Sequence, residues 1–272
     1  MSARPVTPKR WKTLVAVGAA AGLGQALAVQ AQQIDHDTPQ AQIWLAQASS
    51  EAGEGGESGA TAEATPDAAY LTRLALVEGH VIGANAMYAR GLTDEGTALA
   101  GHPEAELMDD VRDSLATHGA ADFSDQLDAV GDAMNDNAGA AKIEMAMSAL
   151  HSGITAAETA GNVPLRAYSD TILALTKAAA FEYAKATETA KVEDMFAYHE
   201  AYGFVLVADR LATDLATSDD AAAAKAGARA HDALTVALAE FGDMAAAKPN
   251  VGDASVIYGA AARIELAALA VK

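Results

Sequence analysis

The sequence contains no cysteine, which excludes disulfides, thiolate metal sites, a cysteine nucleophile and c-type haem attachment. Aromatic residues make up only 5% of the 272 residues, so few bulky side chains are available to fill a core. Basic residues are also scarce, because 18 lysines and arginines face 37 aspartates and glutamates, giving a formal net charge of −19. This charge disfavours nucleic acid and anionic membranes as partners, and it favours a metal ion or a basic protein.

Catalytic signatures are absent from the sequence as well. It has no G-x-S-x-G, no glycine-rich phosphate loop and no H-E-x-x-H. Serine and threonine are scattered at predicted caps and turns, where they have a structural role. We therefore expect the protein not to be an enzyme.

The N-terminus has the layout of a secretion signal. Four basic residues between positions 4 and 12 precede an apolar run over residues 13–29. That run is short and interrupted by glycine, whereas a membrane span needs about 20 apolar residues. We predict a signal peptide over residues 1–31 and a periplasmic or secreted mature chain without a membrane span. An uncleaved membrane anchor is the alternative.

Composition divides the remaining chain into a linker and a folded domain. Residues 32–67 are rich in Gln, Ala, Ser, Glu and Gly, which predicts a flexible acidic linker. An apolar patch at residues 43–45 either docks elsewhere or forms a transient helix. Residues 68–272 are dominated by strong helix formers, and few segments alternate as a strand would. Short connections then predict an all-α, up-and-down antiparallel bundle of about seven or eight helices.

Capping residues, glycines and prolines set the predicted helix ends. The predicted helices cover residues 67–90, 103–118, 124–134, 138–160, 164–187, 194–216, 218–248 and 253–271, with a short helix opening at Thr93. The helix over 194–216 is apolar nearly all round. We expect Tyr183 and Tyr198 to lie on either side of the turn before it, and residues from Phe204 to Leu215 to form a buried stripe.

Two histidines in the first half of the domain are candidate metal ligands. His80 and Met87 lie about 20° apart on one helix face, and imidazole with thioether suits copper or haem iron. His102 precedes a predicted helix start, and Glu106 can face the same side, which suits iron, zinc or manganese. The alternatives are a core histidine with a filler methionine, and acidic residues that stabilise a helix N-terminus.

The later helices hold three more candidates. Glu144, Met147 and His151 recur at spacings of three and four, so they form one stripe. No glutamate is followed by histidine three residues on, so a ferritin-like di-iron oxidase is disfavoured. His199 points away from the Phe204 stripe, toward a second interface or an internal polar site.

One stretch resembles a known family. Its residues are Tyr183, Ala186, Ala190-Lys191-Val192, Tyr198, Glu200 and Phe204. The pattern is similar to the helical extracytoplasmic region of bacterial high-affinity iron permeases. Ala190 stands where glycine is usual, and Ala197 stands where a glutamate precedes the tyrosine. The chain lacks the permease membrane helices with their Arg-Glu-x-x-Glu motif, so the resemblance implies the periplasmic helical module alone.

These patterns together predict an exported helical protein that binds a transition metal for uptake or handling. Iron is favoured, with copper as the second choice, and affinity is expected to fall as histidines protonate at low pH. The predicted ligands are His80, His102, Glu106, Glu144, His151 and His199. The alternative is a non-catalytic helical scaffold in a cell-envelope complex that recruits a basic partner.

Overall fold

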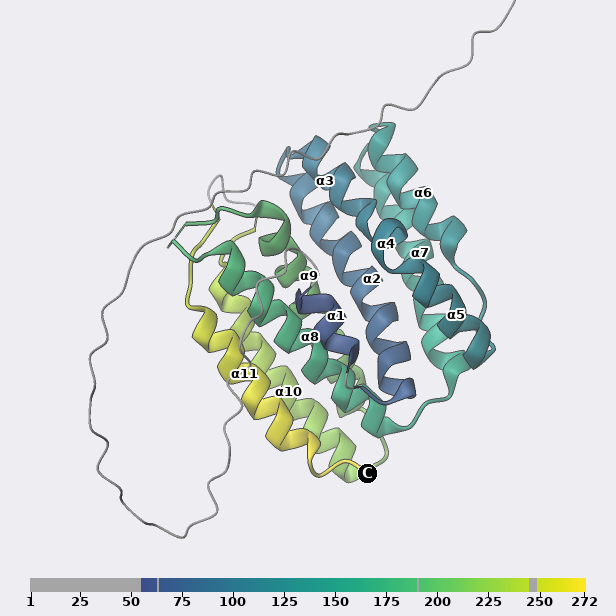
Figure 1. Ribbon diagram of the computed structural model, residues 1–272, viewed down its shortest axis with the longest axis vertical. Coiled ribbons are helices and arrows are strands. Elements are labelled where there is room, and N and C mark those ends of the chain that lie inside the picture. Colours follow the sequence, from purple (N-terminus) through teal and green to yellow (C-terminus); the bar gives the residue numbers. More distant parts are fainter. Residues whose placement is uncertain (1–54, 63, 190, 245–248) are drawn as a thin grey trace, which may run out of the picture. The chain divides into compact units, whose positions relative to one another are not determined.

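The computed structural model describes residues 55–272 except residues 63, 190 and 245–248, and every regular element in that part is helical (Figure 1). The predicted signal peptide, the patch at 43–45 and most of the predicted linker lie outside the described residues. The helices are α1 (Gly55–Ala62), α2 (Pro66–Ala89), α3 (Thr93–Ala100), α4 (His102–Glu106), α5 (Met108–His118), α6 (Ser124–Asn135), α7 (Ala140–Gly161), α8 (Leu165–Ala186), α9 (Met195–Ala216), α10 (Ala221–Leu238), the 3₁₀ turn η1 (Ala239–Phe241) and α11 (Ala254–Ala268). The all-α bundle is confirmed.

Side-chain caps begin most of the long helices. Thr65 caps α2 by accepting a hydrogen bond from the backbone N–H of Ala68, and Pro66 fills the first helical position. Asp194, Asp220 and Asp253 cap α9, α10 and α11 in the same way. Each carboxylate satisfies backbone N–H groups that have no partner inside the helix and complements its positive end.

Two predicted helices differ from the structure. The helix predicted over 103–118 is divided at Leu107, whose side chain packs against both hydrophobic clusters described below, so α4 and α5 are separate. The helix predicted over 218–248 ends earlier, because Gly242 turns the chain with φ of 63°. Residues 55–62, inside the predicted linker, form α1, and Ala60 packs partly buried against the core.

Two hydrophobic clusters share α2. One cluster joins α8–α11 with the α2 residues Ala75 and Leu76, and the other joins α3, α5, α6 and α7 with the α2 residues Leu71, Leu74 and Val77. Figure 1 shows α2 between these two groups of helices. Most of α2 is therefore buried, including the polar side chains Glu78 and His80. A polar group in such a helix must find its partners inside the protein.

An aromatic cluster closes the end of the bundle where α8 and α9 connect. The rings of Tyr183 and Tyr198 lie 5.7 Å apart, and both pack edge-on or tilted against Phe241. The Tyr198 hydroxyl donates to the carbonyl of Phe241, and the Tyr183 hydroxyl donates to that of Glu240. These bonds hold η1 against α8 and α9. The predicted placement of the two tyrosines and the buried stripe from Phe204 to Leu215 are confirmed.

Helices α2 and α9 cross antiparallel in direct backbone contact. A Cβ atom on Gly203 would overlap the carbonyl group of Gly79, and one on Gly83 would lie 2.5 Å from the carbonyl oxygen of His199. Helix α3 approaches α2 in the same way, because a Cβ on Gly96 would lie 2.8 Å from the carbonyl oxygen of Ala84. Only glycine permits approaches this close.

None of the helices in the described part of the chain combines the length and apolar character needed to cross a bilayer.

The crossing predicts that Gly203→Ala costs at least about 2 kcal/mol of unfolding free energy, because an added methyl group in a filled contact forces the two helices apart. The matched control is Gly131→Ala in α6, where a Cβ meets no atom within 4 Å. That change should be neutral or add up to about 1 kcal/mol through helix propensity. Urea denaturation of both variants measures the difference, and equal stability would show that α2 and α9 are not in tight contact.

Candidate metal site

Three side chains from three helices converge beside the α2–α9 crossing. They are His80 of α2, His102 of α4 and Glu200 of α9, and one ligand atom of each lies within 4.8 Å of the others. The Oε1 atom of Glu200 is 3.7 Å from Nε2 of His80 and 3.3 Å from Nδ1 of His102. We call these three residues the His–His–Glu cluster.

Within the cluster, the tautomer of His80 is set by a hydrogen bond. The His80 Nδ1 atom lies 2.8 Å from the carbonyl oxygen of Leu76, and only an Nδ1–H group can donate to a carbonyl. In the neutral ring, the lone pair is then on Nε2, the nitrogen that faces Glu200. Metal-binding histidines are commonly oriented by such a bond from the second ring nitrogen.

His102 forms the accessible side of the cluster. Its side chain is 32% exposed, whereas that of His80 is fully buried and that of Glu200 is 10% exposed. The hydrogen bond to Glu200 raises the pKa of His102, and the nearby charge of Glu106 adds to this rise. The rings of Phe196 and Phe204 lie against His102 and His80. An ion would therefore reach the cluster past His102, and aromatic side chains would exclude water on two sides.

Backbone contacts place all three residues. The glycine crossing brings Glu200 against α2 at the level of His80, because Gly83 touches the backbone of His199 and Glu200. Through Gly96, α3 lies equally close to α2, and the chain then turns at Gly101 into α4, whose first residue is His102. His102 of α4 and Glu200 of α9 are thus both held next to His80 of α2.

The donor set of the His–His–Glu cluster suits a divalent transition metal. Two imidazoles with one carboxylate favour iron or zinc, and this combination with open positions is typical of non-haem Fe²⁺ sites. Neighbouring ligand atoms bound at about 2.1 Å lie about 3 to 3.5 Å apart. The separations of 3.7 and 3.3 Å between Glu200 and the two histidines are close to that range. Three protein ligands leave positions for water or for an exchanging ligand.

His199, which we predicted as a ligand, lies outside this cluster. Its Nδ1–H group donates to the carbonyl of Met195 at 2.7 Å, and its Nε2 lies 3.4 Å from the guanidinium of Arg90. Burial lowers the pKa of His199 to about 4, and the positive charge of Arg90 acts in the same direction. The ring is therefore neutral at physiological pH and accepts a hydrogen bond from Arg90.

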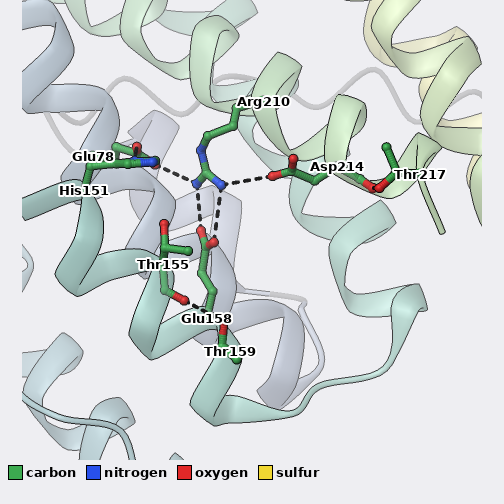
Figure 2. A network of polar contacts seen from close by, with 8 residues as sticks. All are labelled: Glu78, His151, Thr155, Glu158, Thr159, Arg210, Asp214 and Thr217. Atoms are coloured by element: carbon green, nitrogen blue, oxygen red, sulfur yellow. Dashed lines mark hydrogen bonds and ion pairs between the residues drawn. The ribbon is translucent and has the colours of Figure 1, made fainter. Parts of the chain in front are cut away.

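The predicted ligand His151, which is itself exposed, belongs to an ionic network on the other face of α2. Its Nδ1 lies 2.6 Å from Glu78 Oε1, and Arg210 of α9 binds the second oxygen of Glu78 at 2.7 Å (Figure 2). Arg210 also binds both oxygens of Glu158 of α7 and reaches Asp214. Burial raises the pKa of Glu158, although Arg210 opposes this. One guanidinium thus connects α2, α7 and α9.

The other two predicted ligands are exposed. Glu106 acts on His102 through its charge but is not part of the cluster, and Glu144 lines a groove between α2 and α7. Two of the six predicted ligands, His80 and His102, therefore meet, and their third partner is Glu200. The sequence carries a signal for Glu200, since it is the sole carboxylate between Met195 and Ala208 in an apolar helix. A buried carboxylate in such a helix requires a partner.

The second half of the chain has a recognisable family relationship. Residues 162–270 match the family described as iron permease-associated 4-helix bundle domain. The match covers α8, α9, α10 and α11 and includes the stretch on which the resemblance to iron permeases rests, so that resemblance is confirmed. Glu200 lies inside the matched region, whereas His80 and His102 come from the preceding helices. No curated protein and no solved structure matches the chain.

The low pKa of His199 predicts a stability loss in acid. Below the ordinary histidine pKa of about 6.5, the unfolded chain binds a proton that the buried ring does not bind until about pH 4. Unfolding free energy should therefore fall by roughly 3 kcal/mol from this residue as the pH drops from 6.5 to 4. In His199→Gln this part of the pH dependence disappears, as urea titrations at each pH would measure. A His199→Gln curve parallel to the wild type would contradict the assignment.

The ionic network predicts that Arg210→Met destabilises the protein by about 3 kcal/mol at neutral pH, because Glu78 and Glu158 lose their guanidinium partner while buried. At acidic pH the difference in unfolding free energy between Arg210→Met and the wild type should become smaller, because protonated carboxyls no longer need a cation. The surface pair Arg112–Glu104 provides the control, and Arg112→Met should change stability far less. A small effect of Arg210→Met in thermal and urea unfolding would show that the network does not hold the helices together.

Proposed function

We propose that this protein binds a divalent transition metal, with Fe²⁺ favoured, at the His–His–Glu cluster and serves iron uptake or handling. The convergence of His80, His102 and Glu200 from three separate helices carries the proposal. Nitrogen and oxygen donors of this kind suit iron better than copper in its reduced form, which prefers sulfur ligands. The metal is the cargo, and no catalytic step is part of the proposal.

The geometry supports reversible binding. His80 is buried and has its Nε2 lone pair oriented by Leu76, whereas His102 is partly exposed on a short helix. A site with one fixed ligand, one accessible ligand and open positions can both capture and release an ion. Protons compete for His102, so affinity should fall as the pH drops.

The family match and the sequence support a cellular setting for this function. An iron permease-associated domain at residues 162–270 supports a place in an envelope transport complex. The basic and apolar N-terminal segment supports export, so we place the protein in the periplasm or outside the cell. The metal would then be delivered to, or received from, a membrane transporter.

Calorimetric titration of the full chain with Fe²⁺ under anaerobic conditions, and with Zn²⁺, Mn²⁺ and Cu²⁺, tests the proposal. One ion should bind per chain, and His80→Ala or Glu200→Gln should weaken binding at least 100-fold. Loss of a direct ligand should cost more than the 10- to 100-fold typical of residues that only orient ligands. Glu106→Gln should weaken binding only several-fold, because this carboxylate acts through its charge.

The control for these variants is His231→Ala. His231 is exposed and also forms an imidazole–carboxylate pair, with Asp209 at 2.7 Å, but no second histidine completes a cluster there among the described residues. Its removal should leave the affinity unchanged. Failure of all four ions to bind, or binding that survives both His80→Ala and Glu200→Gln, would overturn the proposed function.

A further inference from the structure

A groove of about 680 Å³ runs between α2 and α7, on the side of α2 that carries Glu78. At one end are His151 and Glu78, which belong to the network in Figure 2. Toward the other end, Tyr88 donates a hydrogen bond to Asn137. No residue that lines this groove belongs to the His–His–Glu cluster or to the matched family region. It is therefore a feature that the proposed function does not use.

Both walls of the groove have the spacing of helix-packing faces. The α2 wall is formed by residues 78, 81, 82, 85, 88 and 89, which recur every three or four positions. The α7 wall follows the same spacing through Ile143, Met147 and Leu150. Two such faces offer the ridges and grooves against which a third helix packs. The α2 wall runs from residue 78 to residue 89, which is twelve residues or about 16 Å along a helix, and this equals about three turns of a docked helix.

The charge of the groove indicates which kind of partner helix would bind there. Its lining includes the exposed carboxylate of Glu144, whereas Glu78 is already paired with Arg210 and His151, and it includes no lysine or arginine among the described residues. The whole chain has a formal charge of −19. A second copy of this chain would meet like charge, whereas a basic helix would meet opposite charge.

We propose that the α2–α7 groove binds an amphipathic helix of a partner protein, with apolar residues on one face and lysine or arginine at its edge. The apolar face covers the partly buried side chains of Ile82, Tyr88 and Met147, and a basic side chain pairs with Glu144. This docking is independent of metal binding.

A defined probe tests the groove in the full chain. We would titrate a fluorescent 14-residue leucine–lysine amphipathic helical peptide with the protein in the presence of a chelator and follow anisotropy. Met147→Lys places a charge in the groove wall, whereas Met145→Lys adds the same charge on the same helix at a site that is 72% exposed and outside the lining. Met147→Lys should weaken binding at least tenfold, in line with the loss of one buried apolar contact, and Met145→Lys should change it less than threefold.

Several outcomes would overturn the proposal. These are failure of the wild type to bind the peptide, equal effects of Met147→Lys and Met145→Lys, or equal binding of a leucine–glutamate peptide with the same pattern. Sedimentation of the wild type provides one further test. If the protein self-associates and Met147→Lys abolishes this, the occupant is a second copy of the chain rather than a basic partner. Circular dichroism of both variants confirms that each is folded.

Discussion

The backbone contact between α2 and α9 is the constraint on which the rest of the structure depends. Glycines at positions 79, 83 and 203 let the two helices approach until backbone meets backbone. At that distance a side chain on one helix reaches directly into the environment of the other. His80 meets Glu200 on one side of the crossing, and Arg210 meets Glu78 on another. A wider separation would leave buried polar groups without partners, which is costly in a core of mostly alanine and leucine.

The His–His–Glu cluster is assembled from both halves of the domain. Glu200 belongs to the region that matches the iron permease-associated family, and the two histidines belong to the helices before it. The four-helix region alone therefore supplies one ligand of three. Metal binding in this protein would depend on how α2 and α4 are packed against the matched region. The Arg210 network, which links α2 and α7 to α9, stabilises the same packing from the opposite face of α2.

The helices could be predicted from the sequence more readily than the His–His–Glu cluster. Gly91, Gly119 and Pro164 predicted helix ends close to the observed ones, because these residues act through local backbone geometry. The break at Leu107 depends on tertiary packing, so local signals did not predict it. The early end at Gly242 did have a local signal, the glycine itself, which the predicted helix overran. The composition of residues 55–62 likewise gave no sign of α1.

At the site, His80 and His102 were predicted as metal ligands from their residue type, and the sequence could not show that their side chains lie together. Their convergence depends on the register of α2 against α9 and on the path from α3 to α4, both of which are set by close contacts at glycines. The same contacts explain why Glu200 was missed, since its partners lie about 100 to 120 residues earlier in the chain. His151 and His199 have carboxylate, carbonyl or guanidinium partners that no spacing rule reveals.

Anomalous diffraction from crystals of the full chain grown with Fe²⁺ under anaerobic conditions tests the central claim most directly, because it locates the ion and its ligands together. The account predicts one iron peak between His80, His102 and Glu200, bound by one atom of each. An iron peak at other residues, or no peak at this cluster in iron-loaded crystals, would contradict it.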